Sequence, residues 1–165
     1  MSRRTTAGIA AGVALVAGVL GWLFTAPYLG NTGLARTPGV ILGGTPTPAP
    51  DDFSPLHETH QGPILMKLAS FPPFVNYVNW VGRPGGVITA TRPDGGLWAQ
   101  QVRDDGGDGW LRIGDATYEM RALEIHGEEA VEMMRLWAGG RDINQPLGTG
   151  APLRDWEVFF WVPRS

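Results

Sequence analysis

The sequence predicts a mainly β (α+β) fold, in which one N-terminal transmembrane helix precedes a small antiparallel β-barrel or curled sheet with one packed helix. An uncharged apolar run at the N-terminus, a Pro/Gly-rich stretch behind it and short alternating segments separated by turn residues predict this arrangement. The expected division of the 165-residue chain is a cytoplasmic N-terminus (1–6), a transmembrane helix (7–29), a linker or strap (30–63) and an extracytoplasmic domain (64–165).

The segment Ala7–Leu29 carries no charged residue and is long enough, as a helix, to cross a hydrocarbon core of about 30 Å. Arg3 and Arg4 precede it, and the next basic residue is Arg36. The positive-inside rule therefore predicts a protein of the bacterial inner membrane, with a cytoplasmic N-terminus and a periplasmic or extracellular C-terminal domain. A cleaved signal peptide is the alternative interpretation of the same segment.

Small residues recur at four-residue spacing in this segment. In lipid, such spacing lets two helix backbones approach closely, so we expect contacts with other membrane protein subunits. Alanine and glycine are also common in helices that make no such contact. The residues expected at the interface are Gly8, Gly12, Ala14, Gly18 and Gly21.

The stretch from Asn31 to Pro63 contains many prolines and glycines and is expected to be either a flexible spacer or an extended strap held against a partner. It includes His57 and His60, which stand three residues apart. Two histidines fall short of the four ligands of a structural metal site. We therefore expect solvated histidines and no metal.

The elements expected in the domain follow from turn residues and apolar periodicity. Gly62–Phe74 is expected to form one short helix that ends at Pro72-Pro73. After it, the expected elements are a strand at 74–81, a hairpin of Val87–Thr91 and Leu97–Arg103, a second hairpin of Trp110–Ile113 and Thr117–Ile125, a helix at Glu128–Ala138 and a closing strand at Asp155–Val162.

The closing strand is apolar on both faces, because Phe159, Phe160 and Trp161 are consecutive. One face must therefore contact something besides the inner core of the domain: the helix, a partner or a ligand. Phe159 and Trp161 are the residues that we expect to contact a partner.

Composition excludes several classes of function. The net charge of −3 argues against nucleic acid as a partner, since nucleic-acid binding depends on phosphate neutralisation. The chain has no cysteine, so disulfides and thiolate chemistry are excluded. Asp104, Asp105 and Asp108 lack the spacing of a calcium loop. No nucleophile elbow or phosphate-binding loop is present, and no catalytic residue is assigned.

The run Ile113–Ala122, followed by Gly127-Glu128-Glu129 and by Leu136-Trp137, resembles the C-terminal half of the split β-barrel nitroreductase-like oxidoreductases that use flavin or deazaflavin. Val87–Val102 resembles their first hairpin, and the resemblance covers about 81–163. It implies a split-barrel-like domain with a cofactor near Arg92 and Trp98. The chain departs from the family because the segment between Arg103 and Trp110 is shortened and the usual phosphate-binding residues beside Arg92 are missing. Arg83 and Arg103 are the other nearby candidates.

The first functional hypothesis is a non-catalytic accessory subunit that docks on or stabilises a larger membrane complex, for example a respiratory or photosynthetic one. It would hold no cofactor and would contact other membrane protein subunits through the transmembrane helix, the linker and the aromatic strand. The alternative is a membrane-anchored flavin- or deazaflavin-dependent oxidoreductase of the split-barrel type. A third hypothesis is an exported ligand-binding domain.

Overall fold

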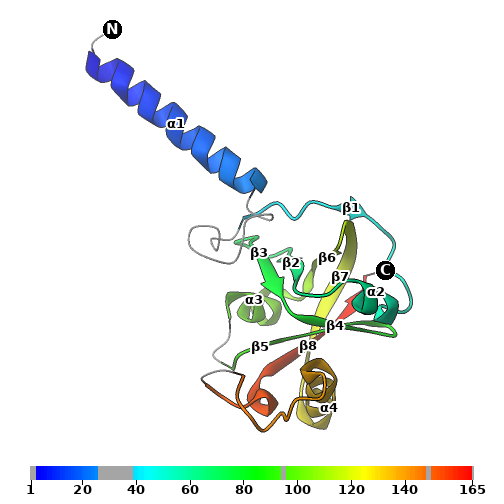
Figure 1. Cartoon of the computed structure of the whole chain (residues 1–165). Coiled ribbons are helices and arrows are strands. Elements are labelled where there is room, and N and C mark those ends of the chain that lie inside the picture. Colours follow the sequence, from blue (N-terminus) through cyan, green and yellow to red (C-terminus); the bar gives the residue numbers. More distant parts are fainter. Residues whose placement is uncertain (1–2, 26–38, 94–95, 148–149, 165) are drawn as a thin grey trace.

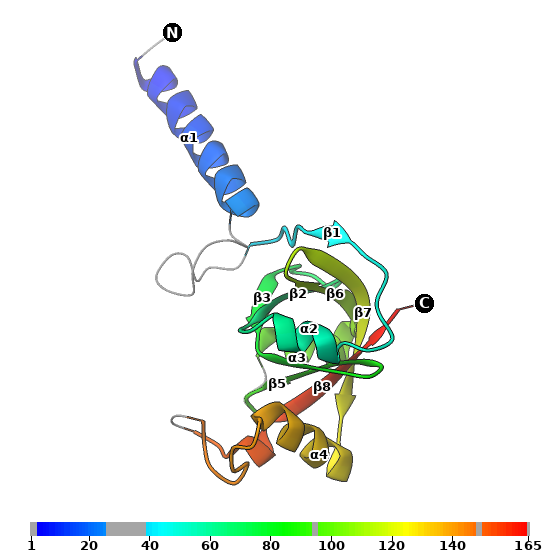
Figure 2. The same ribbon diagram turned by 45° about the vertical axis from the view of Figure 1, so that its right-hand side comes forward.

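The computed structural model describes residues 3–25, 39–93, 96–147 and 150–164. The first helix, α1 (Arg3–Thr25), stands apart from the β domain in both views (Figures 1 and 2). The end of the predicted transmembrane helix, 26–29, and the start of the predicted linker, 30–38, lie outside the described residues.

The predicted membrane crossing is contradicted. Among the described residues, no helix combines the length and the apolar character that a crossing requires. The inner-membrane localisation, which was derived from this helix, is corrected with it.

The β domain is built from antiparallel strands. In the described part of the chain these are β2 (Ile64–Leu68), β3 (Val75–Val78), β4 (Trp80–Arg83), β5 (Gly86–Thr91), β6 (Asp108–Ile113), β7 (Ala116–Ile125) and β8 (Glu157–Pro163). Their order in the sheet is β3-β2-β6-β7-β8-β5-β4.

The two ends of this order are neighbours in the chain, because only Asn79 separates β3 from β4. One extended segment, 75–83, therefore pairs first with β2 and then with β5. The sheet curls round until its ends meet at this segment. The expectation of a split β-barrel with a packed helix agrees with this arrangement.

The inside of the barrel is filled by large apolar side chains. Tyr118, Met120 and Ala122 of β7 point inward and are buried, as their alternation predicted. Phe159 and Trp161 of β8 lie among them and have no exposed area. These two residues were expected to contact a partner, and such a contact would require the core to open.

A second apolar cluster covers the outer face of the barrel beneath α4 (Gly127–Ala138). Ile88 of β5 and Val158 of β8 pack there against Met134 and Trp137 of the helix. Of the three candidates for the second face of the closing strand, the structure therefore shows the helix.

Two predicted elements are wrong. The segment 62–74, expected to be a helix, contains β2, where Ile64, Met66 and Leu68 are buried in alternation. Such a period of two belongs to a strand. The segment 97–103, expected to be the second strand of a hairpin, belongs to the helix α3 (Leu97–Asp105).

The helical form of α3 follows from its buried positions. Trp98, Ala99 and Val102 are buried, and their spacing of one and three residues places them on one side of a helix. Leu97, Ala99, Gln100 and Gln101 are also good helix formers.

Residues 39–63, the described part of the predicted linker, run along the barrel. They include β1 (Thr45–Pro46), which pairs in parallel with β7 (Figures 1 and 2), and α2 (Ser54–Thr59). Phe53 is fully buried, with its ring centroid 5.4 Å from that of Tyr118.

Barrel side chains hold the beginning of this segment by donating hydrogen bonds to its carbonyl groups. Lys67 Nζ donates to the carbonyl of Val40 at 2.7 Å, and Thr117 Oγ1 donates to the carbonyl of Gly43 at 2.8 Å. Burial lowers the pKa of the Lys67 ammonium. Such bonds satisfy backbone groups that an irregular segment cannot pair with itself.

Gly44→Ala is expected to detach this segment from β7. Gly44 has a φ of +86°, and a Cβ there would lie 2.3 Å from Thr117 Oγ1. We expect a loss of about 1–2 kcal/mol in the free energy of unfolding. Hydrogen exchange should also be faster at the amide of Thr45, which donates to Asp115.

Gly62→Ala is the matched control for this prediction. Gly62 has a φ of +93°, and a Cβ there would meet nothing within 4 Å. It carries the same backbone strain without the clash. If the two variants exchanged equally at Thr45, the contact with Thr117 would not be what holds the segment.

Candidate functional site

The connection between β5 and α3 forms a corner with several hydrogen-bond donors. We define the β5–α3 corner as the described residues Thr91–Pro93 and Gly96–Trp98. The strand β5 ends at Thr91, and Gly96 is the N-cap residue of α3, with φ −52° and ψ 150°.

Among the described residues, no side chain caps the start of α3. At this end of the helix, the amides of Ala99 and Gln100 donate hydrogen bonds to the carbonyl of Gly96. The amides of Leu97 and Trp98 come before them, where helical N–H groups have no intrahelical partner. This end of the helix also carries the positive end of the helix dipole, so the corner favours an anion.

The side chains of Thr91 and Trp98 both lie close to Gly96. A Cβ atom on this glycine would lie 3.4 Å from Thr91 Oγ1 and 3.8 Å from Trp98 Nε1. The hydroxyl and the indole N–H therefore lie close to the start of α3. Neither group forms a hydrogen bond with another side chain in the described part of the chain.

The sequence predicted Arg92 and Trp98 as cofactor contacts. Arg92 directly follows Thr91 and is exposed, and no ion pair joins it to any described residue. Trp98 is only 8% exposed, with its ring centroid 4.7 Å from that of Phe159. Most of the Trp98 ring thus belongs to the core, and its edge reaches the corner.

Sequence reasoning missed Thr91 and the start of α3. Both were hidden by the prediction that 97–103 is a strand, because a strand has no free N-terminal amides. The apolar spacing of Trp98, Ala99 and Val102 was a signal that could have revealed the helix.

Arg103 was a further candidate for a phosphate contact, but its guanidinium already forms ion pairs with two carboxylates. Arg103 Nε donates to Glu124 Oε2 at 2.8 Å, its Nη2 atom also contacts Glu124 Oε1, and Nη2 lies 3.1 Å from Glu157 Oε1. The hydrogen bond with Glu124 raises the pKa of Arg103, and the same bond lowers the pKa of Glu124. The guanidinium is therefore not available to an anion.

Arg83, the remaining candidate, lies far from the corner. It pairs with Gly86 at the beginning of β5, whereas the corner begins at the other end of that strand. Arg83 therefore serves as a control position for experiments on the corner.

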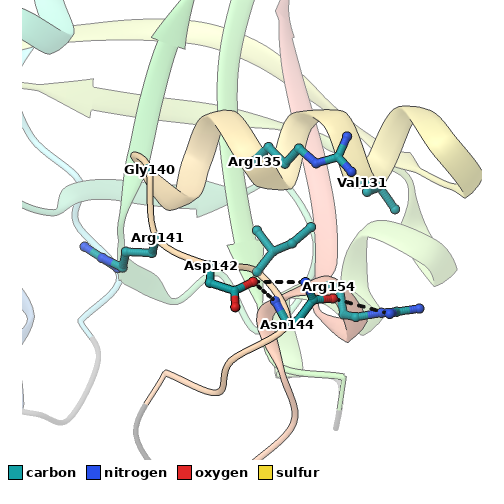
Figure 3. A pocket seen from close by; sticks show the side chains of 8 residues that line it. Val131, Arg135, Gly140, Arg141, Asp142, Asn144 and Arg154 are labelled. Atoms are coloured by element: carbon teal, nitrogen blue, oxygen red, sulfur yellow. Dashed lines mark hydrogen bonds between the residues drawn. The ribbon is translucent and has the colours of Figure 1, made fainter.

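An arginine-lined groove of about 550 Å³ lies beside the C-terminal half of α4 (Figure 3). Arg141 and Arg154 project to opposite sides of it, and Arg135 is paired with Glu132 on the same helix. Asp142 accepts hydrogen bonds from the backbone amide and the side chain of Asn144, both at 2.9 Å, and the amide bond lowers the pKa of Asp142. The arginines do not converge on one point, so the groove is not a built anion site.

The interaction residues expected on the first helix lie on the described part of α1. A Cβ added at Gly8, Gly12, Gly18 or Gly21 would meet nothing within 4 Å, and Ala14 is exposed. Their contact with other subunits stays a prediction.

The comparisons with known proteins include the following two similar structures. No protein-family model matches the chain, and no curated protein matches it. One similar structure, from Listeria innocua, is described as a "Putative Pyridoxamine 5'-phosphate oxidase"; it is 19% identical, covers 67% of this chain and 90% of its own, and has a TM-score of 0.49. The other is Campylobacter jejuni ChuZ, 11% identical, covering 67% of this chain, with a TM-score of 0.46. The match spans half of ChuZ.

One sequence prediction is corrected by this comparison. The chain was expected to hold no cofactor, and this expectation is withdrawn because one similar structure is described as a putative oxidase. The coarse prediction of a split barrel agrees with the curled sheet of this chain, but the nitroreductase family is not shown. At these identities and TM-scores, no activity or ligand is transferred from either protein to this chain.

Proposed function

We propose that this chain is a flavin- or deazaflavin-binding oxidoreductase of the split-barrel type, and that the β5–α3 corner holds the phosphate of the cofactor. The donor set of the corner carries this proposal. Among its described residues, Thr91, Arg92 and Trp98 each offer a hydrogen-bond donor, and the first amides of α3 add backbone donors.

The described residues of the corner fit a phosphate in charge and in hydrogen-bonding chemistry. A phosphate accepts hydrogen bonds at every oxygen, and helix N-termini bind such groups through backbone amides. Arg92 adds a full positive charge, which makes its hydrogen bond stronger than a neutral one. The bound cofactor would supply the hydride-transfer chemistry that side chains lack.

The accessory-subunit hypothesis is less well supported. It depended on a transmembrane helix and an aromatic strand that faces a partner, as well as on a strap-like linker and on the lack of a catalytic constellation. The crossing is contradicted, and Phe159 and Trp161 are buried inside the barrel.

Binding of flavin mononucleotide and of a phosphorylated deazaflavin to the purified full-length protein tests the proposal. We expect at least one of them to bind and Arg92→Gln to weaken that binding about 10- to 100-fold, as expected for the loss of a charge-assisted hydrogen bond of about 1.5–3 kcal/mol. Isothermal titration calorimetry and the absorbance spectrum of the bound cofactor measure both.

Two controls separate the phosphate contact from other effects. Arg83→Gln, at the far end of β5, should leave the affinity unchanged. Riboflavin, which lacks the phosphate, should bind less tightly than flavin mononucleotide and should not respond to Arg92→Gln. Absence of binding by both cofactors would refute the function, and equal binding by wild type and Arg92→Gln would refute the assignment of the corner.

A further inference from the structure

A hollow of about 330 Å³ lies between α2, β4 and the C-terminal end of α4, on elements that do not form the β5–α3 corner. Its apolar lining comes from Trp80 and Trp137, together with the aliphatic side chains of Val81, Leu136 and Ala138. Its polar lining comes from His57, Asn79 and Arg141. This combination of an apolar floor with a few polar groups at the rim is typical of small-molecule sites.

The two indole rings are held in fixed positions. Trp80 Nε1 donates to the carbonyl of Gly62 at 3.1 Å, and Trp137 Nε1 donates to the carbonyl of Asn79 at 3.2 Å. Both residues are less than 10% exposed. Because the N–H groups are already bonded, the rings offer the hollow only apolar and π surface.

His57 presents a hydrogen-bond donor beside this surface. Its ring stands edge-on to Trp80, with centroids 4.9 Å apart and planes at 86°. Its Nδ1 atom is buried and has no hydrogen-bond partner. A buried N–H without an acceptor is costly, so this arrangement favours Nε2 as the ring nitrogen that donates; Nε2 is not among the buried unpartnered atoms.

Arg141 supplies the charge of the site. Its side chain is exposed and forms no ion pair within the described part of the chain. The carbonyl end of α4 nearby opposes an anion, but the carbonyls of Leu136 and Ala138 are already bonded by the amides of Gly139 and Arg141. A full guanidinium charge outweighs the partial charge of a capped helix end.

We propose that this hollow binds an aromatic carboxylate of one or two rings. The ring would lie against Trp80 and Trp137, and the carboxylate would accept hydrogen bonds from Arg141 and from Nε2 of His57. The volume lies at the lower end of the range of about 300–1,000 Å³ for ligand sites, which suits a molecule of this size. The proposal does not depend on the presence of a cofactor at the β5–α3 corner.

Calorimetric titration of the full-length protein with 2-naphthoate and with 2-naphthamide tests the proposal. The two probes share a ring system and differ in charge. We expect naphthoate to bind at least tenfold more tightly than naphthamide. Arg141→Gln should lower the affinity for naphthoate to that for naphthamide and leave naphthamide binding unchanged.

Arg154→Gln is the matched control. Arg154 is also an exposed arginine near α4, but it lines the groove of Figure 3 and not this hollow. It should bind naphthoate as wild type does. Absence of naphthoate binding, equal binding of the two probes by wild type, or equal losses in the two arginine variants would each overturn the proposal.

Discussion

Replacement of Trp161 by alanine is expected to lower the free energy of unfolding by about 3–5 kcal/mol. Trp161 has no exposed area and lies on β8, between β5 and β7. Its Nε1 atom donates to Thr89 Oγ1 at 3.0 Å, and both groups are buried. The substitution creates a cavity and also removes the hydrogen-bond partner of a buried hydroxyl. Urea unfolding of the full-length protein, followed by circular dichroism, measures the change.

Trp156→Ala is the control, because Trp156 is only partly buried at the edge of the outer cluster. It should cost about half as much, since less apolar area leaves water on folding. If Trp161→Ala left the stability unchanged and instead abolished binding of another protein, Trp161 would be an interface residue, as the sequence predicted, and its burial in the barrel would be wrong.

The elements that the sequence predicts well are those with strong local patterns. The strand at 117–125 alternates without interruption, and its alternate residues Tyr118, Met120 and Ala122 are the buried ones. The helix at 128–138 begins with two acidic residues and ends at Gly139, which adopts the left-handed conformation of a C-cap. In both elements the local preference and the packing agree.

The two elements that were predicted wrongly contain short apolar runs. Such runs fit the period of a strand and the period of a helix equally well. Ile64–Leu68 is apolar at four of five positions, so only its pairing with β3 and β6 makes it a strand. The turn at 92–96 suggested a hairpin, and α3 follows instead because Trp98 and Val102 are buried against the barrel.

The candidate site could be predicted only in part. Arg92 and Trp98 were named from the resemblance, but the contribution of Thr91 depends on the position of Gly96, which no local pattern shows. The hollow at the end of α4 joins His57, Trp80 and Arg141 from distant parts of the chain. Such combinations appear only when the fold is known.

Arg103→Met is expected to destabilise the protein by about 2–3 kcal/mol at pH 7. Arg103 joins α3 to Glu124 of β7 and Glu157 of β8, whose side chains are each 17% exposed. Without Arg103, two mostly buried carboxylates lose their common cation, and Glu157 Oε2 is already buried without a partner. The Arg103 side chain is 35% exposed, and solvent screening keeps the loss below that of a fully buried pair.

Arg121→Met is the control for this substitution. Arg121 pairs with Asp108 at 2.6 Å, but the two side chains are 54% and 38% exposed. An exposed pair contributes little to stability, because water and salt screen it. If both variants lost the same stability, burial of the carboxylates would not be the cause of the effect at Arg103.

The dependence of this loss on pH identifies its origin. Hydrogen bonding by Arg103 lowers the pKa of Glu124 in the folded state, whereas in the unfolded chain a glutamate titrates near pH 4.3. A lowered pKa stabilises the fold above the unfolded value, and the stabilisation disappears as the pH falls through the folded value. The difference between wild type and Arg103→Met should therefore be constant from about pH 6 to 8 and shrink below about pH 4.3. Lost packing of the arginine side chain alone would give a difference that does not change with pH, so unfolding curves at pH 7 and in mild acid distinguish the two causes.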